Sequence, residues 1–222
     1  SEFTRQEVLE RYPSIPEEKL KVIHGGVDLE RFHPCSPGVI KERYELNDYL
    51  LCVGEVRPYK NMENVFRALE LWSDGPQLAI SGKIFGDHKA KLENLARSLN
   101  IENRVTWLGY VPDDLLPNLY SEAAAFIFPS LYEGFGLPIL EAMACGCPTL
   151  SSNMASLPEI GGKAAHFFDP KEIGDMAEAI KKVCEDSVYR QKLAQGGPKH
   201  AKKFSWESST KKHMELFETV LN

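Results

Sequence analysis

The 222-residue chain lacks the features that would place it at once in several protein classes. No apolar run approaches the ~20 residues that a membrane-spanning helix needs. The cysteines are odd in number and scattered, with no Cys-x-x-Cys pair and no zinc-binding spacing. We therefore expect reduced thiols in a reducing compartment, and a cytoplasmic protein. The cysteines are Cys35, Cys52, Cys145, Cys147 and Cys184.

An excess of positive charge is also missing. Lysine and arginine number 26 against 32 aspartates and glutamates, which gives a net charge of −6. A nucleic-acid backbone is therefore not expected as a partner, and any anionic ligand must be held by local cations. The acidic residues form no Asp-x-Asp cluster, so we expect no metal requirement.

Internal repeats and low-complexity segments are absent, and short apolar runs alternate with amphipathic stretches. This alternation predicts an α/β fold: a Rossmann-like parallel sheet built from right-handed βαβ units, with helices on both faces. The predicted strands are residues 21–23, 49–53, 77–81, 104–108, 124–128, 149–151 and 164–168. The predicted helices in this part are residues 3–12, 61–72, 88–99, 115–122, 138–144 and 157–160.

From Glu172 onward the pattern predicts helices only, over residues 173–184, 188–200 and 207–221. This gives the fold a helical C-terminal tail. Apolar side chains in this part are expected to pack against neighbouring elements. They are Val183, Leu193, Phe204, Trp206, Phe217 and Leu221.

In open α/β sheets, ligands bind beyond the carboxyl ends of the strands. The first segment in such a position runs from Gly54 to Asn61, where Arg57 and Lys60 precede a predicted helix. Two cations beside a helix N-terminus can close on a phosphate. A solvated loop with ordinary surface cations is the alternative.

Two weaker segments also follow predicted strands. Gly82 permits a close approach by a ligand, but a glycine also simply ends strands. Backbone groups at Tyr110 and Val111 can contact a flat base. Glu159 lies near the same edge, or else in a polar loop that enters the next strand.

The strongest segment combines Glu133, Gly134, Gly136, Pro138 and Glu141 directly after a buried apolar run. The glycines let backbone N–H groups reach an anion, and proline suits a first helical turn. A carboxylate one turn inside a helix can serve only the helix dipole, worth about 0.3–1 kcal/mol. That explanation leaves the Gly-x-Gly turn and Glu133 unexplained. Two carboxylates beside an anion site indicate a ligand that joins phosphate to hydroxyl groups.

Taken in order, these segments resemble the C-terminal, nucleotide-sugar-binding half of retaining GT-B glycosyltransferases, family 4 (glycosyl transferases group 1) in particular. The resemblance covers almost the whole chain. The matching segments are Val22-Ile23-His24-Gly25-Gly26-Val27-Asp28 with Phe32 and Pro34, Gly54 to Asn61, Ala79-Ile80-Ser81-Gly82, Val105 to Val111, Glu133 to Gly146, Pro158-Glu159-Ile160 and Phe204-Ser205-Trp206-Glu207.

The resemblance implies roles by position. Lys60 matches the lysine that meets the donor diphosphate, and Arg57 would support it. Glu133 matches the glutamate near the transferred sugar, and Glu141 the one on the nucleotide ribose. Backbone at Tyr110-Val111 would touch the base. The turn that faces sugar and phosphate matches Gly134, Phe135, Gly136 and Leu137, and Gly82 would also lie at the donor.

Two departures from the family pattern stand out. Glu55 follows the loop glycine, where the family often has arginine, so Arg57 would have to substitute for it. Gly25-Gly26 replaces the usual Asn-Gly before Val-Asp, which affects only the hinge.

The resemblance also implies a division of the chain. Residues 1–20 would end an N-terminal domain and form the crossover, 21–204 would bind the nucleotide sugar, and 205–222 would form a helix that packs back on the N-terminal domain. That domain, which is missing here, would bind the acceptor, so this fragment alone is expected to be inactive. A peripheral position at the inner face of the membrane stays open for the full-length protein.

The expected reaction is transfer of a hexose from a UDP- or GDP-sugar with retention of anomeric configuration. The catalytic residues would be Glu133, Lys60 and Arg57, with cations in place of a metal ion. Glu133 is not assigned as a nucleophile, because a retaining hydrolase needs a second carboxylate about 5 Å away. A nicotinamide oxidoreductase would need a G-x-G-x-x-G that is missing after residues 49–53. A non-catalytic nucleotide-sugar-binding module stays open as the alternative.

Overall fold

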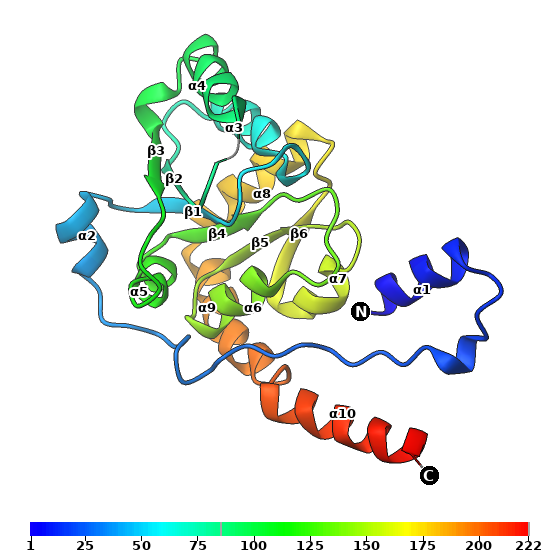
Figure 1. Ribbon diagram of the computed structural model, residues 1–222. Helices are drawn as coiled ribbons and strands as arrows, with labels where there is room; N and C mark the ends of the chain where they lie inside the picture. The colour runs from blue at the N-terminus through cyan, green and yellow to red at the C-terminus, as the bar shows by residue number, and fades with distance from the viewer. Residues whose placement is uncertain (85, 222) are drawn as a thin grey trace.

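The computed structural model describes residues 1–84 and 86–221 (Figure 1). At its centre lies a six-stranded sheet in the order β3-β2-β1-β4-β5-β6. Every neighbouring pair of strands is parallel, which confirms the predicted Rossmann-like α/β fold. The strands are β1 (Tyr49–Val53), β2 (Gln77–Ser81), β3 (Val105–Gly109), β4 (Ala125–Phe128), β5 (Thr149–Ser152) and β6 (Ala165–Phe168).

The central strands are buried on both faces, as continuous apolar runs predict. Side chains alternate between two hydrophobic clusters, because successive residues of a strand point to opposite faces. Leu51 and Phe126 belong to one cluster, whereas Leu50 and Ile127 belong to the other. The sheet therefore separates two helical layers.

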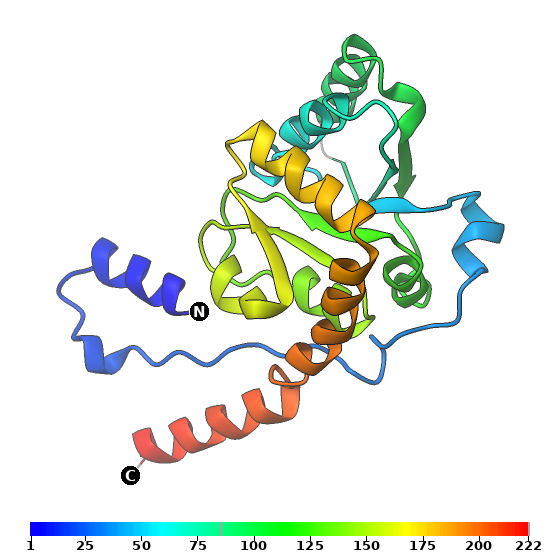
Figure 2. The same ribbon diagram turned by 180° about the vertical axis from the view of Figure 1, so that it is seen from behind.

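Each layer consists of helices from different parts of the chain. Helices α3, α4 and α8 cover one face, and α5, α6 and α7 cover the other (Figure 1). Helix α9 packs against α6 and α8 at the edge near β6, where Figure 2 shows it in front. These helices are α3 (Met62–Glu70), α4 (His88–Ser98), α5 (Leu116–Ser121), α6 (Leu137–Ala144), α7 (Leu157–Gly161), α8 (Ile173–Glu185) and α9 (Ser187–Ala201).

The last helix, α10 (Trp206–Leu221), projects from the domain rather than packing on it (Figure 1). Val183 and Leu193 are buried, as predicted for packing residues. The same prediction is wrong within the described residues for Trp206, Phe217 and Leu221, whose side chains are exposed. The physical reason is that α10 projects away from the sheet and its covering helices, so these side chains stay largely open to solvent.

The N-terminal segment differs most from the sequence prediction. Helix α1 (Glu2–Arg11) and a 3-10 turn (Glu17–Lys19) precede an extended stretch that forms no strand at residues 21–23. This stretch pairs with none of the strands of the described sheet. Its backbone pairing begins at Val27, which forms an isolated bridge with Ser205. The six-residue helix α2 (Val39–Tyr44) was also not predicted, because it is too short to show a helical periodicity of apolar residues.

Among residues 1–84 and 86–221, every helix is too short or too polar to cross a lipid bilayer.

The strand order reverses direction between β1 and β4. The chain moves outward from β1 to β2 and β3, then returns to the other side of β1 with β4. In open α/β sheets the loops that follow two such strands flank a crevice in which ligands bind. The loops after β1 and β4 are the segments that the sequence singled out.

Candidate functional site

Lys60 and Glu133 meet at this point of the sheet. Lys60 ends a short 3-10 turn (Pro58–Lys60) after β1, and Glu133 lies between β4 and α6. The Nζ atom of Lys60 is 2.6 Å from Oε1 of Glu133, and the two side chains are only 15% and 17% exposed. The structure thus brings two of the three predicted catalytic side chains into direct contact.

The backbone around Lys60 holds its side chain in this place. A backbone hydrogen bond from Leu131 to the Tyr59 carbonyl (2.9 Å) ties the β4 loop to the β1 loop. Asn61 donates from its side chain to the Pro170 carbonyl (2.8 Å) instead of capping α3. The Lys60 ammonium also lies 4.5 Å from the centre of the Phe128 ring, a cation–π contact.

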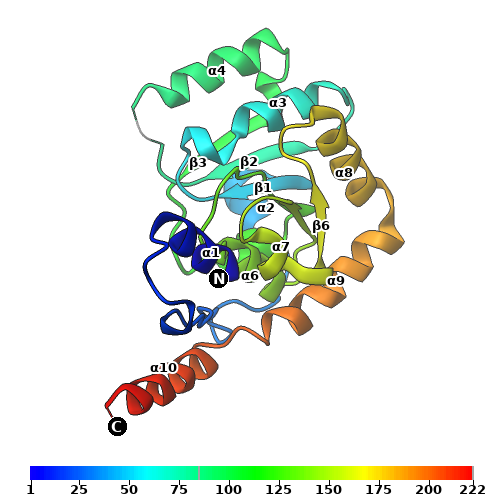
Figure 3. The same cartoon turned by 90° about the vertical axis from the view of Figure 1, so that its right-hand side faces the viewer.

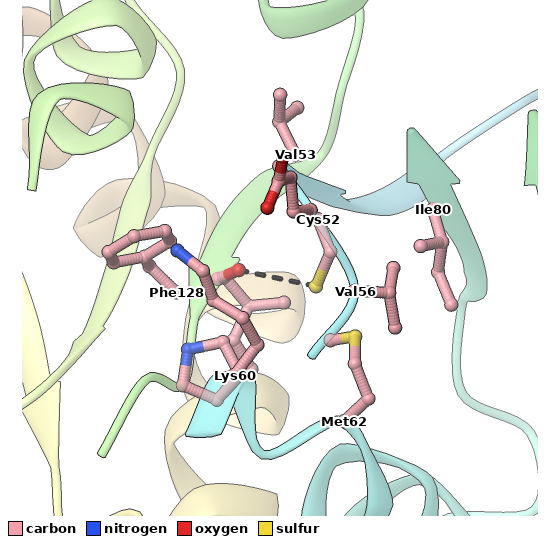
Figure 4. A pocket seen from close by; sticks show the side chains of 11 residues that line it. Cys52, Val53, Val56, Lys60, Met62, Ile80 and Phe128 are labelled. Atoms are coloured by element: carbon pink, nitrogen blue, oxygen red, sulfur yellow. Dashed lines mark hydrogen bonds between the residues drawn. The ribbon is translucent and has the colours of Figure 1, made fainter. Parts of the chain in front are cut away.

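A small cavity lies behind the β1 loop, and Figure 4 shows its lining. Its volume is about 20 Å³, close to the space that one water molecule occupies. The walls are apolar apart from Lys60 and Glu55, and the thiol of Cys52 donates to the Ile127 carbonyl (3.3 Å). The cavity is too small for a nucleotide, so a donor would have to lie outside it, on the open side of Lys60.

Arg57, the third predicted catalytic residue, lies on the surface of the same loop. Its Nε atom donates to Oε2 of Glu55 at 2.8 Å, and the side chains are 44% and 51% exposed. Glu55 is the residue that replaces the usual arginine of the family, so the departure and its proposed substitute form an ion pair. The expectation that Arg57 reaches a phosphate stays a prediction.

The glycine turn before α6 has a specific steric requirement. Gly136 adopts φ +95°, and a Cβ at this position would lie 2.7 Å from Cδ2 of Leu157. Leu137 and Pro138 then open α6, which confirms a proline in the first helical turn. The turn therefore points the start of α6 toward the carboxyl edge of the sheet, where backbone N–H groups favour an anion.

The other residues of this turn contact the N-terminal segment. The carbonyl of Gly134 accepts hydrogen bonds from Ser1 Oγ (2.7 Å) and Thr4 Oγ1 (3.1 Å). Phe135 packs against the rings of His24 and Phe204. Residues far apart in the sequence thus surround the turn.

Glu141 lies one turn inside α6, half-buried against α5. The hydroxyl of Tyr120 donates to its Oε2 at 3.0 Å. Burial raises the pKa of Glu141, while the Tyr120 hydrogen bond and the charge of Arg31 lower it by less than burial raises it. A carboxylate that the fold destabilises in its charged form is more typical of a functional site than of a dipole partner.

Gly82 lies against the backbone of Gly54 at the end of β1. It adopts φ +141°, and a Cβ there would come within 1.9 Å of the Gly54 carbonyl oxygen. The close approach between the ends of β1 and β2 therefore requires a glycine without any ligand. Beyond β3, Tyr110 is 76% exposed and Val111 is buried. Donor contacts at these three positions stay predictions.

Glu159 has a structural role that the sequence left open. Its carboxylate accepts hydrogen bonds from the backbone N–H groups of Glu2 (2.9 Å) and Phe3 (3.4 Å), and contacts His24 Nε2 at 2.5 Å. Burial raises the pKa of Glu159, but these hydrogen bonds outweigh it and leave the pKa below its usual value. Glu159 thus holds the first turn of α1 beside the candidate site.

Sequence reasoning missed Ser1, Thr4 and Tyr120 as residues of this region. The two hydroxyls offered no signal, because their contact with Gly134 joins positions more than 120 residues apart. Tyr120 offered a weak one, since a buried tyrosine hydroxyl usually finds a polar partner. The described residues contain no group of three or more His, Cys, Asp or Glu side chains suited to a metal ion.

Comparisons with known proteins agree with one another. The model of a family described as "Glycosyl transferases group 1" matches residues 40–200. O-antigen chain mannosyltransferase B of Escherichia coli is 33% identical over 99% of this chain and 59% of its own length. Serotype-specific mannosyltransferase WbdA of Escherichia coli is 31% identical over the whole chain and 28% of its own length. The chain thus spans about three fifths of the first relative and less of the second.

Solved structures show the same architecture. Sucrose-phosphate synthase of Thermosynechococcus elongatus superposes with a TM-score of 0.83 at 25% identity, over 98% of this chain and 57% of the other. HepE of Anabaena, solved in complex with UDP, superposes with a TM-score of 0.87 at 23% identity, over 99% of this chain and 62% of the other. At such identity the likeness to HepE shows the fold alone.

Proposed function

This chain belongs to the family of group 1 glycosyl transferases, and we propose that it binds the nucleoside diphosphate sugar of a retaining hexosyltransferase. The observation that carries the proposal is the Lys60–Glu133 contact at the reversal of strand order, with Glu141 one turn inside the adjacent helix. The mannosyltransferase names of the Escherichia coli relatives support a hexose. The UDP bound to HepE supports a nucleotide donor.

The diphosphate would lie beside Lys60 and the start of α6. As the bond between sugar and diphosphate breaks, negative charge grows on the leaving group and positive charge on the sugar ring. An ammonium already held by Glu133 and Phe128 needs little reorganisation to stabilise that charge. One preorganised donor of this kind is worth about 2.7–4 kcal/mol. Arg57 would add a second cation on the exposed side of the loop.

Glu133 would orient the sugar. Lys60 occupies its Oε1, while within the described residues no hydrogen bond engages Oε2, which can accept from sugar hydroxyls. The contact with Lys60 would hold the carboxylate next to the diphosphate. Glu133 would therefore act on the donor through hydrogen bonds and charge, and no covalent intermediate is assigned to it.

Glu141 would accept from the ribose hydroxyls at the other end of the donor. Backbone groups at Tyr110 and Val111 would contact the base. In this proposal the site contacts the sugar, the diphosphate and the ribose of one donor. It needs no metal ion, because Lys60 and the start of α6 face the phosphates.

The whole enzyme would need a second part. The chain spans 59% of the mannosyltransferase relative, so we assign acceptor binding to an N-terminal domain outside these residues. The exposed apolar side chains of α10 would pack on that domain, and residues 1–20 would belong to its end. The enzyme would work in the cytoplasm. If its acceptor is bound to the membrane, the enzyme would work at the inner face of that membrane.

Calorimetric titration of the folded chain with UDP-sugars and GDP-sugars, with and without magnesium, tests the proposal. We expect saturable binding of at least one nucleotide sugar, with little change on adding magnesium. A folded chain that binds none of them contradicts the proposed function.

A further inference from the structure

A second concave site lies at the other edge of the sheet and is lined by cations. It has a volume of about 280 Å³, and four of its eight lining residues are lysines. His200 and Leu193 form part of its floor, and no lining residue is acidic. The lysines are Lys163, Lys192, Lys199 and Lys203. We call this site the lysine pocket.

Two elements build the lysine pocket. Lys192 and Lys199 lie two turns apart on one face of α9, and Lys203 follows just beyond the end of this helix. Lys163 faces them from the 3-10 turn (Gly162–Ala164) that leads into β6. A contact between His200 Nε2 and the Ile160 carbonyl (2.8 Å) fixes α9 against this turn, as their neighbouring positions in Figure 3 suggest.

The lysine pocket is separate from the donor site. The 3-10 turn precedes β6, so the pocket lies toward the amino ends of the strands. Lys60 and Glu133 lie in loops that follow strands, at the carboxyl ends. The two sites therefore lie at opposite ends of the parallel strands, with α6 and α7 between them. One small ligand cannot contact both.

The charges of the lysine pocket lack counter-ions among the described residues. Within residues 1–84 and 86–221, none of its four lysines forms an ion pair with a carboxylate. Lys199 and Lys203 lie near the C-terminus of α9, where the helix dipole stabilises a positive charge by about 0.3–1 kcal/mol each. This interaction explains why lysines occur at these two positions. It does not explain Lys192, two turns earlier, or Lys163, which lies on another element. In a chain of net charge −6, this clustering of cations brings no evident gain in stability.

We propose that the lysine pocket binds the phosphate group of an anionic ligand. Lysine ammonium groups bind phosphate as point charges, and several around one concavity neutralise a dianion. The volume lies just below the usual range of ligand pockets, about 300–1,000 Å³, which suits a phosphate with a short substituent better than a nucleotide. The ligand is a soluble phosphate compound or the phosphate headgroup of an anionic lipid.

Nuclear magnetic resonance can locate the binding, because Gly162 and Gly196 report on the lysine pocket while Gly54 and Gly134 report on the donor site. Inorganic phosphate is titrated into the labelled chain at about 150 mM salt, at which weak surface attraction is screened. We expect the amide signals of Gly162 and Gly196 to shift in a saturable way. The double variant Lys192→Gln/Lys199→Gln should weaken this binding about tenfold or more.

A matched double variant, Lys89→Gln/Lys91→Gln on α4, removes the same charge elsewhere and should leave the binding unchanged. Cosedimentation with vesicles of phosphatidylcholine, alone or mixed equally with phosphatidylglycerol, separates the two ligand sources. Binding to the mixed vesicles that Lys192→Gln/Lys199→Gln abolishes assigns the pocket to lipid. Phosphate binding without vesicle binding assigns it to a soluble ligand. No shift at Gly162 and Gly196, or equal losses in both double variants, overturns the proposal.

A different observation carries a second inference, which rests on the proposed function. Tyr120 is fully buried, and its hydroxyl donates to Oε2 of Glu141 at 3.0 Å. This leaves Oε1 of Glu141 as the acceptor available to a ligand. We infer that Tyr120 is a positioning residue, which orients Glu141 toward the ribose of the donor.

The chain offers a close control for this inference. Tyr49 is also a buried tyrosine that contacts α5, and its hydroxyl donates to the Leu119 carbonyl at 2.7 Å. Tyr120→Phe and Tyr49→Phe each remove one buried hydroxyl, but only the first touches Glu141. A general loss of stability should therefore affect both variants, whereas a positioning effect should affect Tyr120→Phe alone.

The readout is the affinity for a nucleoside diphosphate compared with that for its dideoxyribose analogue. We expect Tyr120→Phe to lose most of the preference for ribose, by about fivefold or more, and Tyr49→Phe to keep it. Tyr120→Phe with an unchanged ribose preference overturns the positioning role. If the unaltered chain shows no ribose preference, the assignment of Glu141 in the proposed function fails instead.

Discussion

The Lys60 ammonium lies 2.6 Å from a carboxylate oxygen of Glu133, although 73 positions separate the two residues in the chain. The loops after β1 and β4 bring them together because these strands are neighbours at the reversal of strand order. Neither side chain is freely solvated. A cation and an anion are thus fixed side by side, where a leaving diphosphate and a sugar would meet.

Lys60→Ala should weaken binding of a nucleoside diphosphate about ten- to hundredfold, because it removes one charge-assisted contact. Binding of the nucleoside without phosphates should hardly change. Calorimetry with both ligands makes the comparison. Arg57→Ala, on the exposed side of the loop, should have a smaller effect. Equal losses for nucleoside and diphosphate would argue against a phosphate contact at Lys60.

Glu141→Gln should stabilise the fold while it reduces nucleotide affinity. Burial raises the pKa of Glu141 in the folded state, so its contribution to stability is present at low pH and is lost as the pH rises through that pKa. At neutral pH the neutral amide should be more stable by on the order of 1 kcal/mol. Thermal unfolding measured from acidic to neutral pH should show a growing advantage of the variant. A variant that is less stable at neutral pH would contradict the cost assigned to the buried charge.

Acid should release the first turn of α1. The pKa of Glu159 is lowered from its usual 4.5, so its contribution is complete above that pH and is lost as the pH falls through the lower, folded value. His24 and the backbone N–H groups of Glu2 and Phe3 are the groups that face the carboxylate. Protection of the Glu2 and Phe3 amide protons, measured as exchange relative to the intrinsic rate at each pH, should fall in that acidic range, and Glu159→Gln should remove this dependence. Protection that stays constant across the range would show that Glu159 does not hold α1.

Gly136→Ala should destabilise the chain by about 1–3 kcal/mol, because alanine is strained at φ +95° and its Cβ would press on Leu157. Gly174→Ala is the matched control, since Gly174 lies in α8 with open space around it. That change should stabilise by about 0.4–1 kcal/mol. Denaturant unfolding compares the two. A neutral effect at Gly136 would mean that the turn before α6 tolerates other conformations.

Much of the fold could be predicted from the sequence because its inner strands, β1, β2, β4 and β5, are largely buried. The runs at residues 49–53 and 77–81 coincide with β1 and β2, and only a parallel sheet between helices buries such runs on both faces. The prediction for residues 104–108 began one residue early. Arg104 ends a 3-10 turn and donates to the carbonyls of Leu69 and Trp72, so β3 starts at Val105.

The failures lie where tertiary contacts decide the local structure. Residues 21–23 have the composition of a strand but pair with none of the six strands of the described sheet. Helix α2 is too short for a periodic pattern and is flanked by two residues with positive φ, Gly38 and Glu45. The apolar residues of α10 predict packing in the core. The sequence pattern does not show whether this face packs on the same domain or on another surface.

The candidate site shows the same division. Loop positions and residue types indicated Lys60, Glu133 and Glu141 as separate elements of a donor site. Their partners could not be predicted, because the Lys60–Glu133 and Tyr120–Glu141 contacts depend on how the loops and α5 pack. Burial of Glu141 is likewise a property of the α5–α6 contact rather than of the motif.

The most direct test of the central claim is the gain in affinity that the sugar brings, measured as the ratio between a nucleoside diphosphate sugar and the nucleoside diphosphate. Calorimetry gives this ratio for the unaltered chain, for Glu133→Gln and for Glu141→Gln. We expect Glu133→Gln to lose the gain from the sugar and to keep its affinity for the nucleoside diphosphate. Glu141→Gln should lose affinity for both ligands and keep their ratio. If the two variants behave alike, Glu133 and Glu141 do not read opposite ends of one nucleotide sugar.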